Sequence, residues 1–237
     1  MIFLGAFVAL FSVEGVKFSS RTQDIIKGVG MEIEMGSVTG LLGRSGSGKS
    51  TLLKLVAGIL VPTGGRVLFD GKDIQLMSNV ENKTFRRRCS YVFQDSALWA
   101  NQTIEQNLNL PLQTHNQSMS RDERSSRIRR MCEIVRFNRP LSLRPVDLSM
   151  GEQKRVAFAR ALINDPEVLF LDECTESLDQ DGSDHILSLL VDFINSGKTV
   201  IYVSHRSEFI DIMNRSRNSR VYDIEAGFLR GADDYEI

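Results

Sequence analysis

The chain has 237 residues, of which 42% are hydrophobic and 25% charged, a composition typical of a folded globular protein. This composition excludes wholesale disorder. The 29 basic and 30 acidic residues give a formal net charge of −1, without the basic excess of most nucleic-acid binders. We therefore expect one large domain over residues 1–237, with no nucleic-acid partner.

The cysteines and the apolar N-terminal stretch bear on the compartment. Cys89, Cys132 and Cys174 are odd in number and far apart, so the sequence predicts neither a disulfide framework nor a zinc site. Met1–Val13 is almost wholly apolar, but it contains no basic residue and is too short to span a bilayer. We expect reduced thiols in a chain that is soluble by itself, and we assign no role to Met1–Ala6.

Strand-like and helix-like segments alternate along the chain, which is typical of an α/β domain with a largely parallel sheet. Apolar runs predict a first strand that ends near Phe18, followed by strands over Val38–Leu42, Gly64–Asp70, Ser90–Phe93, Val168–Leu171 and Thr199–Val203. Helical spacing and end signals predict helices over Ser50 to about Leu60, Glu152–Asn164 and Ser183–Asn195.

The stretch from about residue 95 to 147 differs from the rest, because it is polar and has weak strand signals. Four apolar residues recur at helical spacing and predict one buried stripe: Ile128, Met131, Cys132 and Val135. Arg121–Arg130 is rich in arginine, and we interpret it as a solvated helix face, with a docking surface as the alternative. We therefore predict a helical insertion in this stretch.

A glycine-rich loop follows the predicted strand Val38–Leu42 and precedes a helix. It fits the pattern GxxxxGK[ST] in full and comprises Gly43, Arg44, Ser45, Gly46, Ser47, Gly48, Lys49, Ser50 and Thr51. The glycines let backbone N–H groups wrap a polyphosphate, and the helix presents its positive end to the same anion. Lys49 can reach the β- and γ-phosphates, and the Ser50 hydroxyl can bind Mg²⁺. The loop predicts a nucleoside triphosphate site.

A second half-site follows the apolar run Val168–Leu171, which ends in two carboxylates. Such a run is typical of a buried parallel strand whose C-terminal end meets the ligand crevice. We expect Asp172 to hold the Mg²⁺ shell. Glu173 is placed to polarise a water for in-line attack on the γ-phosphate.

The remaining motifs resemble those of the ATP-binding cassette (ABC) ATPases. Leu148-Ser149-Met150-Gly151-Glu152 and the residues after it are similar to the LSGGQ signature and its helix. Further segments resemble, in the family's order, the Q-loop (Tyr91–Gln94), the Walker B and D-loop run (Asp172–Asp179) and the switch histidine (Val203–His205). The resemblance spans about Val13 to Gly227. A P-loop kinase for a small molecule is a further alternative, but it would leave the signature, Asp179 and His205 without roles.

The resemblance implies a P-loop NTPase fold with a largely parallel central sheet, a helical subdomain at about residues 95–147 and an N-terminal antiparallel β portion. It also implies a head-to-tail dimer in which each ATP lies between one copy's phosphate loop and the other copy's signature. On this basis Gln94 would contact Mg²⁺ and the attacking water, and His205 would contact the γ-phosphate. Across the dimer, Ser149, Gly151, Glu152 and Asp179 would complete the nucleotide site.

Three positions depart from the family pattern. Met150 replaces the first signature glycine, and Glu152 stands where Gln is usual. Because Ser149 and Gly151 remain, we expect γ-phosphate contact to survive, and we expect the bulk of Met150 to slow closure. The aromatic that stacks on adenine is expected near Ser20, where the nearest ring is Phe18, which we interpret as a core residue. Cys174 stands where proline is common, and we expect it to be small and buried.

Two short segments resemble bacterial cassettes that move lipids, the Mce-associated phospholipid type, or that release lipoproteins: Phe93–Trp99 and Thr103–Leu112. This resemblance implies an ATP-hydrolysing subunit that powers transport, with phospholipid as its cargo. It implies membrane permease subunits, a periplasmic lipid-binding subunit and a place on the cytoplasmic face of the inner membrane. The alternative is a cassette that gates a membrane complex for regulation or envelope remodelling without moving solute.

Overall fold

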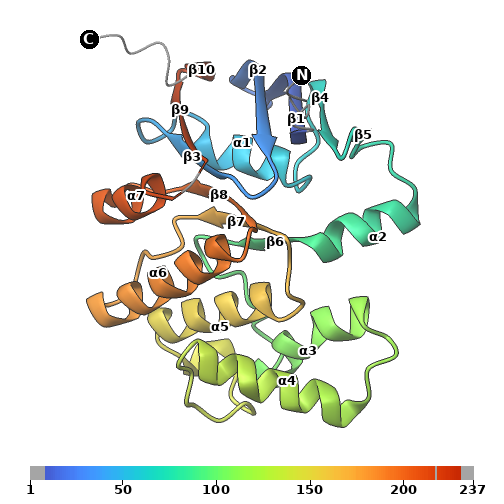
Figure 1. Cartoon of the computed structure of the whole chain (residues 1–237), viewed down its shortest axis with the longest axis vertical. Coiled ribbons are helices and arrows are strands. Elements are labelled where there is room, and N and C mark those ends of the chain that lie inside the picture. The colour runs from blue at the N-terminus through green and yellow to red at the C-terminus, as the bar shows by residue number, and fades with distance from the viewer. Residues whose placement is uncertain (1–8, 217, 231–237) are drawn as a thin grey trace, which may run out of the picture. The chain divides into compact units, whose positions relative to one another are not determined.

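The computed structural model describes residues 9–230 except 217, so the apolar Met1–Ala6 segment lies outside the described residues (Figure 1). The chain divides into two compact units. The phosphate-loop unit comprises residues 1–85 and 193–237, and the helical unit comprises Arg86–Asp192.

The phosphate-loop unit contains a four-stranded antiparallel sheet in the order β2-β1-β4-β5. Its strands are β1 (Ala9–Ser19), β2 (Asp24–Glu34), β4 (Gly64–Phe69) and β5 (Lys72–Asp73). The rings of Phe11 and Phe69 lie 5.0 Å apart, and Phe85 packs 4.9 Å from Phe69, so aromatic burial holds one face of this sheet. The expected N-terminal antiparallel portion is therefore present.

The same unit contains a second group of strands, in the order β10-β9-β3-β8. These are β3 (Val38–Leu42), β8 (Thr199–Val203), β9 (Ser219–Glu225) and β10 (Phe228–Arg230), with β3 parallel to both β8 and β9. Helices α1 (Lys49–Val56) and α7 (Ser207–Asn214) pack on these strands. Both β3 and β8 are almost wholly buried, which explains their continuous apolar runs.

The helical unit has two parallel strands, β6 (Cys89–Val92) and β7 (Val168–Asp172), and three helices that contact one another. The helices are α3 (Ile104–His115), α4 (Arg121–Ile134) and α5 (Met150–Leu162), and a 3₁₀ turn covers Pro145–Asp147. A capping box begins each of the three helices, so sequence-local hydrogen bonds fix where each one starts. The predicted helical insertion is confirmed by α3 and α4.

Two helices cross the boundary between the units, α2 (Asn79–Arg88) and α6 (Gln180–Asn195).

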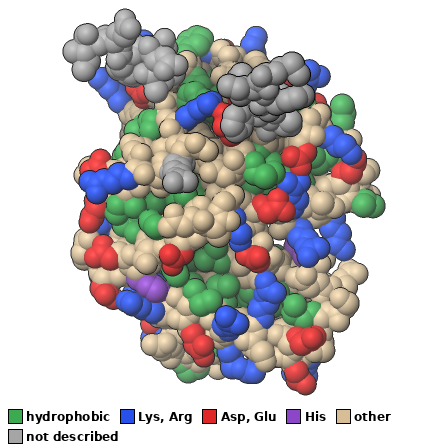
Figure 2. All heavy atoms as spheres, in the orientation of Figure 1, with side chains coloured by type: hydrophobic (Ala, Val, Ile, Leu, Met, Phe, Trp, Pro, Cys, Tyr) green, Lys and Arg blue, Asp and Glu red, His purple; other side chains and the backbone are tan. Residues whose placement is uncertain are grey.

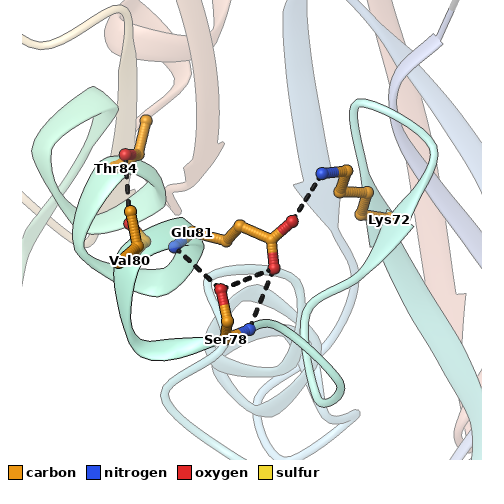
Figure 3. A network of polar contacts seen from close by, with 5 residues as sticks. All are labelled: Lys72, Ser78, Val80, Glu81 and Thr84. Atoms are coloured by element: carbon orange, nitrogen blue, oxygen red, sulfur yellow. Dashed lines mark hydrogen bonds and ion pairs between the residues drawn. The ribbon is translucent and has the colours of Figure 1, made fainter.

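The start of α2 is held by a network around Glu81, which accepts hydrogen bonds from the Ser78 backbone and from Lys72 (Figure 3). The Lys72 contact, followed by those of Ser78, lowers the pKa of Glu81 to about 2. This carboxylate therefore favours the fold above its unfolded pKa, and the contribution is lost as the pH falls through about 2.

Several predicted boundaries differ from the structure. The helix expected to run to Leu60 ends at Val56, because Ala57 caps it and Gly58 takes a left-handed φ of 63°. Strand β2, helices α2 and α7, and strands β9 and β10 had no counterpart among the predicted elements. The predicted stripe on α4 is largely confirmed, because Ile128, Cys132 and Val135 are buried and Met131 is half-buried.

The charged surface agrees with the near-zero net charge. Figure 2 shows acidic and basic side chains interspersed over the visible face. In the Arg121–Arg130 stretch, Arg121, Arg129 and Arg130 are exposed, as expected for a solvated face. Arg127 instead donates a 2.6 Å hydrogen bond to the Ile163 carbonyl. Among the described residues, no helix combines the length and apolarity needed to cross a bilayer.

Candidate functional site

The phosphate loop lies between β3 and α1, as the sequence predicts. The Lys49 ammonium is buried at 6% exposure and donates 2.8 Å hydrogen bonds to the carbonyls of Gly43 and Arg44. These bonds draw the two ends of the loop together around the lysine. The loop therefore presents a cation and the start of a helix to the same space.

Two glycines of the loop have no room for a side chain. Gly43 has a φ of 132°, and a Cβ there would lie 2.3 Å from the Ile224 carbonyl oxygen. Gly48 caps α1 with a φ of 105°, and its Cβ would lie 2.8 Å from Ile26 Cδ1. Close packing against β9 and β2 thus forces the chain into the turn that the glycines permit.

A hollow of about 900 Å³ adjoins the loop within the same unit. It is lined by Leu42–Ser47 on one side and by residues of β9, the following turn and β10 on the other. The Ser47 hydroxyl oxygen is buried and has no hydrogen-bond partner within the described part of the chain. An anion in the loop would offer this hydroxyl an acceptor.

His205 lies at the same edge of the sheet as the phosphate loop. It follows β8, which runs parallel to β3 in the register Gly40↔Tyr202, so the C-terminal ends of both strands meet at one edge. His205 is exposed, and the preceding Ser204 is buried, with its hydroxyl accepting a 3.2 Å bond from the Arg206 N–H. The structure therefore brings this histidine and the loop to one edge within the phosphate-loop unit.

In the helical unit, Asp172 lies at the end of β7 and is 2% exposed. The Tyr91 hydroxyl donates a 2.9 Å hydrogen bond to Asp172 Oδ2 from the neighbouring strand β6. Burial, followed by the charge of Asp172, raises the pKa of Tyr91 far above its usual range, so the phenol stays protonated and keeps donating. The bond therefore orients a buried carboxylate at the end of β7.

The residues after these two strands also meet. The Gln94 side-chain amide donates a 2.8 Å hydrogen bond to Glu176 Oε2, which ties the predicted Q-loop to the segment after Asp172. Glu173 is half-buried and has a φ of 48°, a left-handed conformation that is strained for a residue with a Cβ. Strain at this position is typical of a side chain that the backbone must aim at a functional target.

The signature and the D-loop form one surface in the helical unit. Ser149 caps α5, with its hydroxyl accepting from the Glu152 N–H, and a Cβ on Gly151 would lie 3.3 Å from the Ser177 carbonyl. A hollow of about 620 Å³ adjoins both segments, and it is lined by Arg136–Arg139, Ser149–Glu152, Arg155 and Ser177–Asp179. The structure thus brings the predicted signature residues and Asp179 together.

The departures from the family pattern have visible consequences. Glu152 completes the capping box and accepts a 3.0 Å bond from Arg139, and its bond from the Ser149 backbone is the main cause that lowers its pKa. Met150 is 68% exposed at the hollow. Cys174 is buried, as expected, and burial raises its pKa to about 12.

The position expected for an adenine-stacking ring is polar and solvated. Ser20 is exposed, and Phe18 is half-buried on β1, where it pairs with Ile26 of β2. This agrees with the interpretation of Phe18 as a residue of the sheet.

The residues predicted from the sequence to bind Mg²⁺ carry oxygen donors that suit a hard cation. Ser50 supplies a hydroxyl, Asp172 a carboxylate and Gln94 a side-chain carbonyl, the ligand types that Mg²⁺ prefers. Among the described residues, no group of three or more His, Cys, Asp or Glu side chains is placed to hold a metal ion. These residues therefore fit a cation that keeps water and phosphate oxygens in its shell.

Comparison with known proteins defines the family. The model of the ABC transporter family matches residues 26–176, and the chain therefore belongs to this family. The predicted fold is confirmed as the ABC ATPase fold, with a mixed sheet, a helical subdomain and an N-terminal antiparallel sheet. The class of enzyme that this fold and family define is an ATPase.

Two curated relatives and one solved structure illustrate the match. The methionine import ATP-binding protein MetN 2 of Enterococcus faecalis is 34% identical over 88% of this chain and 61% of its own length. The corresponding MetN of Clostridioides difficile is 34% identical over 93% of this chain and 71% of its own length. The ATP-binding cassette MJ0796, solved as a post-hydrolysis dimer with ADP and phosphate, is 28% identical to this chain, with a TM-score of 0.82. The match covers 93% of this chain and 98% of the MJ0796 chain.

Some residues that shape the site were missed by sequence reasoning. Tyr91 was noted only as part of the Q-loop pattern, and its bond to Asp172 depends on the register between β6 and β7. Arg139 was not singled out, although it pairs with a signature residue. A polar residue inside an apolar strand was the available signal for Tyr91, because a buried phenol usually needs a partner.

Proposed function

We propose that the chain is the ATP-hydrolysing subunit of an ABC transporter and that it works as a head-to-tail pair of copies. The observation that carries this proposal is a second surface suited to phosphate, far in sequence from the phosphate loop. Ser149 at the start of α5 lines a hollow in the helical unit together with three arginines, each of which forms an ion pair with a carboxylate. A helix start with nearby cations favours an anion.

In this scheme the phosphate loop holds the triphosphate of ATP. The backbone of Gly43–Thr51 wraps the phosphates, and the Lys49 ammonium exchanges its bonds with loop carbonyls for bonds with phosphate oxygens. His205, at the same edge, contacts the γ-phosphate. The buried Ser47 hydroxyl supports phosphate binding by the loop, since it lacks a hydrogen-bond partner within the described residues.

The helical unit supplies the hydrolytic groups, and we propose that the two units act together as one ATPase domain. Glu173 takes the proton of the attacking water, and Gln94 positions that water. Ser50, Asp172 and Gln94 would hold Mg²⁺, with Tyr91 fixing the Asp172 carboxylate. When bound, the ion would neutralise charge on the terminal phosphates.

The second copy completes each site. Ser149, Gly151 and Glu152 of one copy would face the γ-phosphate bound by the other, and Asp179 would act across the interface. ATP therefore joins the two copies, and hydrolysis removes the charge that joined them. The cassette MJ0796, which was solved as a dimer bound to ADP and phosphate, supports the pairing of two copies.

We propose that the pair binds membrane permease subunits on the cytoplasmic face of the inner membrane. The relatives that are named for methionine import support a small polar solute as the cargo. They do not support the phospholipid cargo and the periplasmic lipid-binding subunit expected from Phe93–Trp99 and Thr103–Leu112. Short segments near the Q-loop are a weaker guide to cargo than a match over most of the chain.

Glu173→Gln tests the proposal. The amide cannot accept the proton from water, so hydrolysis is expected to fall at least about 100-fold while ATP binding is kept. The variant should also form an ATP-dependent dimer, measured by light scattering. Glu167→Gln is the matched control, because Glu167 forms an exposed ion pair with Arg88 before β7. Unchanged hydrolysis in Glu173→Gln would remove this carboxylate from the role of base.

A further inference from the structure

The signature helix α5 carries two cations that reach the segment just after β6. The Lys154 ammonium donates to the carbonyls of Phe93 at 3.1 Å and Gln94 at 2.5 Å. The Arg160 guanidinium donates to the carbonyls of Ser96 at 2.9 Å and Ala97 at 2.8 Å. Four of the five consecutive carbonyls from residue 93 to 97 are therefore bound by one helix.

The burial of Lys154 carries a desolvation cost. It is 2% exposed, and burial lowers its pKa, while charge on Glu176, Asp95 and Asp172 acts in the opposite direction. A buried ammonium destabilises a fold unless hydrogen bonds and opposite charges compensate it. The neighbouring buried positions of α5 are apolar, from Val156 to Ala159, so packing alone does not require a lysine here.

The segment that these cations hold is strained. Ser96 and Ala97 both have left-handed backbone angles, with φ of 63° and 43°. Such angles persist in residues with a Cβ only when the surrounding structure imposes them. The paired bonds from Arg160 supply that constraint, and they fix the path of the chain directly after Gln94.

We propose that Lys154 and Arg160 are positioning residues that clamp the Phe93–Ala97 segment to α5, so that displacement of the signature end of this helix is carried to Gln94. This inference rests on the proposed function, in which Ser149 meets the partner's γ-phosphate. The clamp joins that event to the Gln94 side chain, which bonds Glu176 close to the hydrolytic carboxylates. ATP bound by one copy thereby sets the position of Gln94 in the other.

The test is a double-mutant cycle between the clamp and Gln94, with ATP hydrolysis by the full chain as the readout. Lys154→Met keeps the buried volume and removes both hydrogen bonds. We expect Lys154→Met and Gln94→Ala each to lower kcat about tenfold and to raise the Mg²⁺ concentration that gives half-maximal rate. The double variant should also lose only about tenfold in kcat, because both changes disturb the same element. The KM for ATP should stay within about twofold, since the phosphate loop is unchanged.

Arg127→Met is the matched control, because it also removes a cation bound to a backbone carbonyl, that of Ile163, outside the clamped segment. It should leave the Mg²⁺ dependence unchanged even where it lowers Tm. Arg160→Lys keeps the charge and loses one of the two bonds, so it tests the clamp in a mild variant. It should raise the Mg²⁺ requirement in the same direction as Lys154→Met.

Multiplying losses, about a hundredfold in the double variant, would overturn the clamp, as would an unchanged Mg²⁺ dependence in Arg160→Lys. Either result leaves the proposed function intact provided that the unmodified chain hydrolyses ATP and Glu173→Gln does not. An unmodified chain that does not hydrolyse ATP, or a Glu173→Gln variant that hydrolyses it normally, would instead reject the proposed function itself.

Discussion

The proposed site draws on both units, and each unit builds its share in a different way. In the phosphate-loop unit the site is mainly backbone, where glycines at Gly43 and Gly48 have no space for a Cβ and one buried lysine crosses the loop. In the helical unit the site is mainly side chains, such as Asp172 and Gln94, each fixed by a hydrogen bond to another side chain. Substitutions that add atoms should therefore be most harmful in the phosphate-loop unit. Substitutions that remove a single hydrogen-bond donor should be most harmful in the helical unit.

Lys49→Met probes the buried lysine of the phosphate loop. Methionine keeps the volume of the buried stem, so the fold should be retained. ATP binding, measured by calorimetry, is expected to weaken about 10- to 100-fold, because hydrogen bonds to charged groups contribute about 1.5–3 kcal/mol. Binding within twofold of the unmodified chain would mean that backbone groups alone hold the phosphates.

Gly43→Ala against Gly46→Ala separates lack of space from backbone strain. Both glycines have positive φ, but a Cβ on Gly43 would meet the Ile224 carbonyl at 2.3 Å, whereas one on Gly46 would meet no atom within 4 Å. Gly43→Ala should therefore lose about 1–3 kcal/mol more free energy of unfolding than Gly46→Ala, as overpacked sites do. Denaturant unfolding measures this difference, and equal losses would show that strain alone sets the requirement.

Tyr91→Phe tests the helical half by removing a single donor. The Asp172 carboxylate loses its 2.9 Å bond, so we expect about a tenfold lower kcat, corresponding to roughly 1.4 kcal/mol. Tyr202→Phe is the control, because that hydroxyl bonds Asn214 in the other unit at 3.2 Å. Equal effects of the two changes on kcat would contradict an orienting role for Tyr91.

The contrast also explains what could be predicted from the sequence. The phosphate loop and Asp172 lie in contiguous patterns whose chemistry follows from residue spacing, and strands β3 and β8 are buried apolar runs. The signature was assigned from its resemblance to the family motif. Strand β2 and helix α2 were missed because one alternates with polar residues and the other contains only one buried residue, Phe85. Tertiary packing stabilises both, and no local pattern records it.

Contacts between distant segments were beyond prediction for a related reason. The bonds of Lys154 to Gln94 and of Arg139 to Glu152 join loops whose approach depends on the packing of α5 against its neighbours. The spacing of charged residues in the sequence carries no information on which carbonyl or carboxylate each will meet.

The most direct test of the shared site mixes two disabled chains, one carrying Lys49→Met and the other Ser149→Arg. Neither alone should hydrolyse ATP, since every site in either homodimer lacks a component. In a mixed pair, one site joins an intact phosphate loop to an intact signature. Mixing should restore about a quarter of the unmodified activity, because half of random pairs hold one complete site of two. A mixture as inactive as its separate components would contradict the account.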